Sequence, residues 1–244
     1  MSASPISVRN LTVAYGGQPA IVDVTWQAPD SALLAIVGPN GAGKTTLLKA
    51  ILGLVPTAEG QISIHGRPIE DQRGIIAYVP QRSAVDWDFP ATALDVVTMG
   101  RYRRIGWLRP VRGADREAAR THLATVGLTE VADRQIGSLS GGQQQRVFLA
   151  RALAQEARIY LLDEPFAGVD AVTGRVMIDV LRRLRDGGAL IVCVHHDLGS
   201  VTDIFDHVLL LNRRLVAAGP TGTTFTPDLI ARTYGLPLTG SGPV

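Results

Sequence analysis

The sequence is poor in cysteine, lysine and aromatic residues, and it lacks a long apolar run. Its single cysteine, Cys193, excludes a disulfide framework and a cysteine-rich metal site. Because Cys193 lies in the apolar segment 189–194, a small buried hydrophobe is favoured over a reactive thiol. No apolar run approaches the roughly 18 residues of a membrane span, and the N-terminus lacks the pattern of a signal peptide. These absences predict a soluble intracellular protein that reaches a membrane only through a partner.

The sequence also lacks a large excess of positive or negative charge. The chain of 244 residues has 24 Lys and Arg against 22 Asp and Glu, a formal net charge of +2. This near-balance is not typical of a general nucleic-acid binder, so no nucleic-acid partner is expected. Only Lys44 and Lys49 are lysines, and the other residues of this class are arginines. Because arginine is used at almost every other basic position, a lysine in this chain indicates a position that needs a compact ammonium group.

What the chain does contain is an alternation of short apolar segments with segments of helical spacing. The continuous apolar run 32–37 predicts a strand buried on both faces, and the alternation as a whole predicts a parallel α/β sheet. The stretch 82–139 carries helical spacing, which indicates an inserted helical subdomain. The predicted strands are 6–13, 21–26, 32–37, 61–64, 74–79, 159–163, 190–194 and 208–211, and the predicted helices are 44–54, 91–99, 114–126, 143–155 and 172–185.

A glycine-rich segment directly follows the buried strand. It reads Gly38, Pro39, Asn40, Gly41, Ala42, Gly43, Lys44 and Thr45, the pattern of a phosphate-binding loop. Glycines let backbone N–H groups approach phosphates, and the start of the following helix adds a favourable dipole. We expect Lys44 to reach the β- and γ-phosphates of ATP, Thr45 to bind Mg²⁺, and the nucleotide contacts to extend to Thr46. A glycine-rich turn without a ligand is the alternative, and the strand before it and the helix after it argue against that reading.

Two adjacent carboxylates, Asp163 and Glu164, follow the apolar run 159–162. In a doubly wound sheet, ligands bind at the carboxyl ends of the strands. Asp163 is therefore predicted to hold Mg²⁺, mostly through water, and Glu164 to polarise an attacking water molecule. A solvated strand end is the alternative, and the upstream phosphate loop disfavours it.

A third motif lies between these two. Ser140 is a good helix N-cap, and Gly141 and Gly142 leave N–H groups accessible at a helix start, which makes a second anion-binding site. Together with Leu139 and Gln143, these residues resemble the signature sequence of ATP-binding-cassette (ABC) ATPases. The motifs follow one another in the order that is typical of that family, and the resemblance covers about residues 6–215.

The resemblance implies a fold and an assembly. The fold is an α/β P-loop NTPase core of ABC type with an N-terminal antiparallel β subdomain and an inserted helical subdomain. Residues 1–81 and 140–235 would form the core and β subdomain, 82–139 the helical subdomain, and 236–244 a flexible tail. The assembly is a head-to-tail homodimer, in which the signature of one subunit completes the ATP site of the other.

Four further positions match the family. The resemblance implies that Tyr15 stacks on adenine, that Gln81 contacts Mg²⁺ and begins the helical subdomain, and that His196 contacts the γ-phosphate. Asp170 matches the aspartate of a loop between subunits. A metal site at 195–197 is the alternative for the histidine, and it is disfavoured because adjacent strand residues point to opposite faces.

One departure from the family pattern precedes Asp170. Ala167, Gly168 and Val169 stand where many members have Ser-Ala-Leu. The hydrogen bonds of the missing serine are therefore in question.

Weaker similarities, in segments outside the nucleotide-binding motifs, indicate one branch of the family. The segments 87–90, 99–102, 106–108 and 166–170 together resemble the manganese/zinc importer ATPases. A single cassette without a membrane span is typical of a bacterial importer, in which the ATPase lies at the cytoplasmic face of the membrane and the permease subunits are separate chains. Those subunits would be direct partners, and an extracytoplasmic metal-binding protein an indirect one. A siderophore importer ATPase and a non-transport ABC ATPase stay open as alternatives.

The segment 101–120 contains seven arginines against Asp115 and Glu117. Such a segment is either a solvated basic face or a surface close to anionic lipid or to a permease loop.

Overall fold

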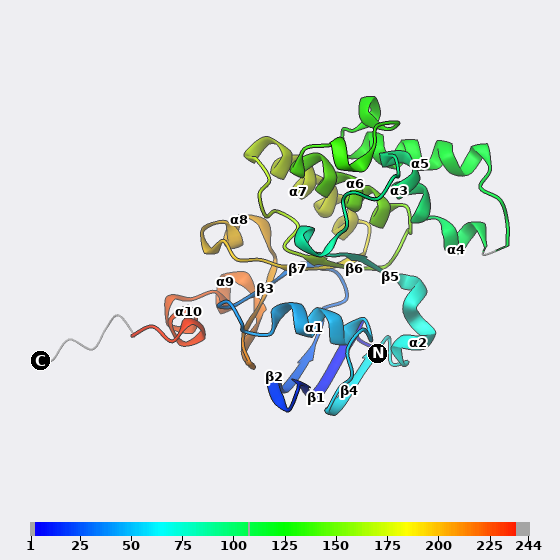
Figure 1. Ribbon diagram of the computed structural model, residues 1–244. Coiled ribbons are helices and arrows are strands. Elements are labelled where there is room, and N and C mark those ends of the chain that lie inside the picture. The colour runs from blue at the N-terminus through cyan, green and yellow to red at the C-terminus, as the bar shows by residue number, and fades with distance from the viewer. Residues whose placement is uncertain (1–2, 107, 238–244) are drawn as a thin grey trace, which may run out of the picture. The chain divides into compact units, whose positions relative to one another are not determined.

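The structure, a computed structural model, describes residues 3–106 and 108–237 (Figure 1). The chain divides into two compact units, the first made of residues 3–73 and 190–237 and the second of residues 74–189 without 107. None of the helices in these ranges is long and apolar enough to span a bilayer. Trp107 of the segment 106–108, and the predicted tail from residue 238 onward, lie outside the described residues.

Three antiparallel strands form the small sheet of the first unit, in the order β2-β1-β4. β1 spans Ile6–Tyr15, β2 spans Gln18–Gln27 and β4 spans Glu59–Ile64. This sheet confirms the expected antiparallel β subdomain. β1 and β2 extend beyond their predicted ends because a turn at Gly16 and Gly17, both with positive φ, joins them into a hairpin.

A second group of strands in this unit leads into the glycine-rich loop. β3 (Ala32–Val37) lies between β7 (Leu190–Val194) and β8 (His207–Asn212) and is parallel to both. Every residue of β3 is buried, as its apolar run predicts. The parallel pairing of β3 with β7 and β8 agrees with the predicted parallel α/β sheet. β9 (Arg214–Pro220), a strand that was not predicted, pairs antiparallel with β8. The chain reverses at Arg213, whose φ of 55° makes a tight turn without a glycine.

Short helices complete the first unit, and Cys193 lies in its core. The helices are α1 (Lys44–Ile51), α2 (Ile69–Gln72), α8 (Val201–Ile204), α9 (Thr221–Thr224) and α10 (Pro227–Tyr234). Cys193 belongs to β7 and is fully buried, and burial raises the pKa of its thiol. This confirms its interpretation as a small hydrophobe.

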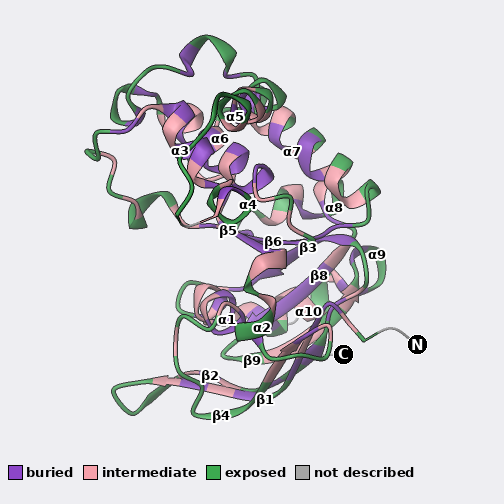
Figure 2. Ribbon diagram, turned by 90° about the vertical axis from the view of Figure 1, so that its right-hand side faces the viewer, coloured by how far each residue is buried: buried purple, intermediate pink, exposed green. Residues whose placement is uncertain are grey.

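The second unit joins one strand pair to a group of helices. β5 (Ile76–Val79) and β6 (Ile159–Asp163) are parallel, so their carboxyl ends share one edge. α6 packs against α3, α5 and β5, and Figure 2 shows buried residues along α3 and α6. The limits of a helical subdomain at 82 and 139 stay a prediction. The helices are α3 (Ala93–Met99), α4 (Tyr102–Ile105), α5 (Gly113–Thr125), α6 (Gly141–Leu153) and α7 (Ala171–Asp186).

Two glycines of the first unit allow a test of close backbone packing. Gly60 (φ 85°) and Gly17 (φ 81°) share a left-handed conformation, but only at Gly60 would a Cβ collide, at 2.4 Å from the carbonyl oxygens of Arg9 and Asn10. We expect Gly17→Ala to lower the free energy of unfolding by about 1 kcal/mol through backbone strain alone. Gly60→Ala should lose about 1–3 kcal/mol more because backbone atoms must move. Urea unfolding measures both, and equal losses would contradict this packing.

Candidate functional site

The loop from Gly38 to Lys44 joins β3 to α1. α1 begins at Lys44, its N-cap residue Gly43 makes no side-chain capping bond, and its first turn contains no acidic residue, so the positive end of the helix dipole favours an anion here. The Lys44 Nζ donates to the carbonyl oxygens of Gly38 (2.8 Å) and Pro39 (2.9 Å), which holds the ammonium inside the loop. This arrangement fits a phosphate chain. Of the other predicted loop residues, Asn40 and Gly41 are exposed, Ala42 is buried, and Thr45 and Thr46 are half-buried on the first turn of α1.

Two glycines fix the position of the loop. A Cβ added to Gly38 would lie 1.9 Å from the carbonyl oxygen of Leu211, at the end of β8. A Cβ added to Gly43 would lie 2.8 Å from the carbonyl oxygen of Ala20, in β2, and Gly43 also has a φ of 91°. Only glycine fits at either position, so the loop passes against the backbone on both sides.

Tyr15 lies in the hairpin that contacts this loop. It is the last residue of β1, and β2 carries the Ala20 carbonyl next to Gly43. The Tyr15 side chain is 49% exposed, so its ring is accessible to a flat aromatic base.

The two histidines after β7 have different surroundings. His195 is buried, and its Nε2 lies 2.8 Å from the Ser200 hydroxyl, which donates to Asp197 Oδ2 at 2.7 Å. The hydrogen bond from Ser200 holds the pKa of Asp197 below its usual value. His196 is exposed. The geometry gives His195 a structural role and leaves His196 accessible to a ligand. Within residues 3–106 and 108–237, no three His, Cys, Asp or Glu side chains are grouped to hold a metal ion, so nothing supports the alternative metal site at 195–197.

The second unit brings Gln81 and Glu164 into contact. Gln81 follows β5 and Glu164 follows β6, and the Gln81 Nε2 donates to Glu164 Oε2 at 2.9 Å. Asp163, the last residue of β6, is 1% exposed. Burial, and after it the charge of Asp163, raises the pKa of Tyr78 to about 12. Glu164 has a φ of 52°, which is uncommon outside glycine, so the chain turns sharply at this carboxylate. Carboxylate and amide oxygens, the ligands that Mg²⁺ prefers, thus lie at the carboxyl edge of β5 and β6.

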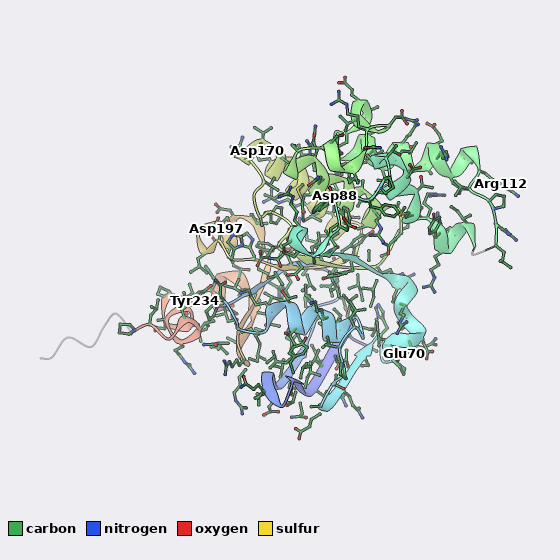
Figure 3. The ribbon with its side chains drawn as sticks, viewed as in Figure 1. Glu70, Asp88, Arg112, Asp170, Asp197 and Tyr234 are labelled. Carbon is green, nitrogen blue, oxygen red and sulfur yellow. The ribbon has the colours of Figure 1, made fainter. Side chains whose placement is uncertain are left out.

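The signature residues begin α6. The Ser140 Oγ accepts from the Gln143 backbone N–H at 3.3 Å, and the Gln143 Oε1 accepts from the Ser140 N–H at 2.9 Å. This reciprocal capping box confirms Ser140 as the N-cap. Asp170 lies close by, because a Cβ on Gly142 would be 3.9 Å from its Oδ2. Asp170, which is labelled in Figure 3, caps α7 by accepting hydrogen bonds from two backbone N–H groups at 3.0 and 2.9 Å. These bonds hold its pKa below the usual value.

The loop before Asp170 keeps its shape without a serine. The Ala167 N–H donates to the carbonyl oxygen of Glu164 at 3.2 Å, and the Val169 N–H donates to that of Phe166 at 3.3 Å. Gly168 supplies the positive φ of 68° that the turn needs. Backbone hydrogen bonds therefore hold this turn where the family's serine is missing.

One residue of this region, Arg82, is absent from the sequence-based predictions. Its Nε and Nη2 donate to the Gln144 Oε1 at 3.1 and 3.0 Å, and its guanidinium lies against Gly141. The Trp87 indole donates to the Arg82 carbonyl oxygen at 2.9 Å, and its ring lies 5.2 Å from that of Phe148 in α6. The segment that begins at Gln81 is thus bound to the first turns of the signature helix. The only signal in the sequence is Gln144 itself, a polar residue on a buried face of α6.

Comparisons with known proteins identify the family of the chain. The profile described as ABC transporter matches residues 21–167. The manganese transport system ATP-binding protein MntB of Bacillus subtilis (strain 168) is 54% identical over 235 residues, which cover 96% of this chain and 94% of that protein. The zinc transport system ATP-binding protein TroB of Treponema pallidum (strain Nichols) is 50% identical over 234 residues, covering 96% and 88%.

Two solved structures of ABC transporter proteins are similar to this chain in fold. A metal-chelate type ABC transporter in an inward-facing conformation matches with a TM-score of 0.84 and 30% identity over 97% of this chain and 90% of that one. A nucleotide-free ATP-binding cassette from an ABC transporter has a TM-score of 0.80 at 23% identity over 94% and 98%, a likeness of fold alone. The chain therefore belongs to the ABC transporter family, as a nucleotide-binding ATPase whose hydrolysis is coupled to transport.

Proposed function

We propose that this chain is the ATP-hydrolysing subunit of a bacterial importer for manganese or zinc, located at the cytoplasmic face of the membrane. The hydrogen bond between Gln81 and Glu164 carries the catalytic part of this proposal, because it places an amide against a candidate base. The choice of metal is supported by the names of relatives that are 54% and 50% identical. An extracytoplasmic metal-binding protein would select the ion, which this chain would not contact.

The glycine loop provides the features needed to hold the phosphates of ATP. The positive Lys44 ammonium would neutralise negative charge on the β- and γ-phosphates. The loop glycines allow backbone N–H groups to approach the same phosphates. Tyr15 would stack on the adenine ring. The Thr45 hydroxyl, the Gln81 amide oxygen and the Asp163 carboxylate are each a kind of ligand that Mg²⁺ prefers, and each would contribute to holding the ion. When bound, that ion neutralises the charge that develops on the phosphates.

Hydrolysis requires a base next to the attacking water. Glu164 would accept the proton of that water, and the amide of Gln81 orients the carboxylate by donating to one of its oxygens. His196 would donate a hydrogen bond to the γ-phosphate, because its ring is exposed whereas that of His195 is buried.

The signature residues would act on the nucleotide of a second copy of this chain. Gly141 and Gly142 bring the start of α6 close to a ligand without side chains, and the Ser140 hydroxyl lies at the same place. Asp170 sits beside Gly142 at the start of α7. A head-to-tail homodimer explains why one chain carries two anion-binding helix starts.

The permease subunits would contact the arginine-rich segment. Arg101, Arg104 and Arg120 pair with acidic side chains of the same unit, which accounts for part of the segment as a structural face. Arg103 and Arg109 instead line a cavity of about 640 Å³ with Tyr102 and Val111. Leu108, 93% exposed, adds an apolar surface. Arginine beside exposed apolar residues is typical of a protein contact.

One observation favours a second candidate, import of a metal chelate. The solved structure with a TM-score of 0.84 at 30% identity is described as a metal-chelate type transporter. Growth on different metal sources separates the two candidates.

A deletion strain tests the proposal as a whole. Wild type and the exposed control Glu130→Gln should restore growth when manganese or zinc is chelated, and Glu164→Gln should not. The purified Glu164→Gln variant should still bind ATP but hydrolyse it about 100-fold more slowly or worse, because an amide cannot act as a base. It should accumulate a dimer with MgATP in gel filtration. Rescue only with an iron chelate would overturn the manganese/zinc assignment, and an active, monomeric Glu164→Gln would overturn the choice of base.

The two histidines give a matched pair. His196→Ala should abolish hydrolysis without changing the thermal midpoint, because the exposed ring acts only on the nucleotide. His195→Ala should keep most of the activity but lower stability by about 1–3 kcal/mol, because Ser200 loses a buried partner. Steady-state ATPase assays and calorimetry measure the two effects. Equal loss of activity in both variants would mean that the wrong histidine has been chosen.

Arg82→Ala tests the connection to the signature helix. We expect kcat for ATP hydrolysis to fall about tenfold, since one charge-assisted hydrogen-bonded contact contributes about 1.5–3 kcal/mol to positioning. Nucleotide affinity of the monomer should stay unchanged, because the glycine loop does not use Arg82. Arg134→Ala, an exposed arginine of the same unit, is the control. A change in nucleotide affinity with kcat intact would contradict a positioning role.

A further inference from the structure

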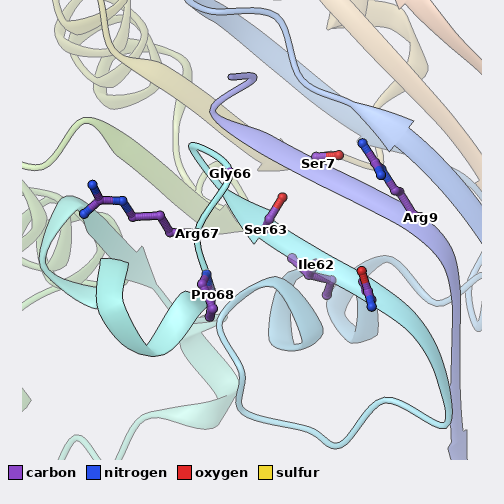
Figure 4. A pocket seen from close by; sticks show the side chains of 8 residues that line it. Ser7, Arg9, Ile62, Ser63, Gly66, Arg67 and Pro68 are labelled. Carbon is purple, nitrogen blue, oxygen red and sulfur yellow. The ribbon is translucent and has the colours of Figure 1, made fainter. Parts of the chain in front are cut away.

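The outward face of the β2-β1-β4 sheet contains a hollow that none of the roles above uses. It has a volume of about 570 Å³ and is lined by β1, β4 and the turn after β4 (Figure 4). Ser7 of β1 is paired across the strands with Ser63 of β4, and Arg9 is paired with Gln61. These four side chains alternate with the residues of β1 and β4 that face the core, so they share the outer face of the sheet.

The lining of the hollow is cationic. Arg9 and Arg67 both belong to it, and the other described residues that line it are uncharged. Neither arginine has an acidic partner within the described part of the chain. In Figure 4, Arg9 and Ser63 project from the same side of the two strands, whereas Arg67 extends from the turn after β4 away from them. Two unpaired guanidinium groups make the local potential positive and attract anions.

A buried hydroxyl adds a second, independent observation. The Ser7 Oγ has almost no solvent contact and makes no hydrogen bond with the described residues. An unpaired buried donor costs about 1–3 kcal/mol, which a ligand that accepts its hydrogen bond would recover. The hollow thus combines guanidinium groups, which only donate hydrogen bonds, with serine hydroxyls, which can also donate, and this combination favours an oxyanion.

We propose that this hollow binds the phosphate group of a small soluble phosphate monoester, held by Arg9, Ser7 and Ser63, with Arg67 at the rim. The planar guanidinium matches two phosphate oxygens at once. A cation finds no carboxylate here, and an apolar ligand would leave the donors unpaired. The volume lies within the range of small-molecule sites, about 300–1,000 Å³, and exceeds what a bare phosphate ion fills. The hollow is formed without any residue of the glycine loop, so the proposal does not depend on the ATPase chemistry.

Titration calorimetry on the full chain tests the site, with a saturating non-hydrolysable ATP analogue to fill the glycine loop. The probes are glycerol 3-phosphate and inorganic phosphate. We expect both to bind the wild type, the monoester more tightly. Arg9→Gln should weaken binding by about 10- to 100-fold, the effect of losing a hydrogen bond to a charged group. Ser7→Ala should also weaken binding, and without a ligand it should be neutral or stabilising, because it removes the unpaired hydroxyl.

Arg214→Gln, which changes an exposed arginine of the same unit paired with Asp23, is the matched control and should bind like the wild type. Tighter binding of inorganic phosphate than of the monoester would overturn the monoester assignment. The absence of binding at millimolar probe, or equal affinity of Arg9→Gln and the wild type, would overturn the site itself. Thermal unfolding of each variant shows that it is folded.

Discussion

The position of the glycine loop depends on two backbone carbonyls that approach it too closely for a side chain. The Leu211 oxygen opposes Gly38 and the Ala20 oxygen opposes Gly43. A hydrogen bond of 2.9 Å from the Arg213 N–H to the Ala42 carbonyl adds a third backbone contact. β2 and the turn between β8 and β9 therefore help to fix the position of the loop through their backbone atoms. The location of Lys44 is a consequence of this packing, because its ammonium is held by carbonyls of the same loop.

Features with a short-range cause could be predicted from the sequence. The buried strand 32–37, the loop after it and the N-cap Ser140 each depend on residues only a few positions apart. β9 was not predicted, because its pairing depends on a reversal at Arg213 that carries no glycine or proline. Arg82 was not predicted either, since its partner Gln144 lies 62 positions further along the chain. Gln144, a polar residue among the apolar positions of its helix, is the only signal in the sequence, and it does not identify Arg82 as its partner.

The comparison of His195 with His196 shows how far the site could be predicted. The family pattern selects one histidine, and the structure adds a physical reason by burying the other beside Ser200. In the loop before Asp170, the structure adds two backbone hydrogen bonds that the sequence alone did not reveal. Asp170 itself has an additional task that the sequence did not reveal, since its carboxylate caps α7. A residue that is proposed to act on a nucleotide thus also stabilises the helix that it begins.

The surroundings of Cys193 have a practical consequence. Cys193 belongs to β7, and its thiol is fully buried. Burial also raises the pKa of the thiol, so little thiolate forms and an alkylating reagent has little access to it. A cysteine introduced on the surface of each unit would then react selectively with a maleimide dye or a spin label, without removal of the native residue. Fluorescence transfer or electron paramagnetic resonance between two such labels would report the separation of the two units as nucleotide is added.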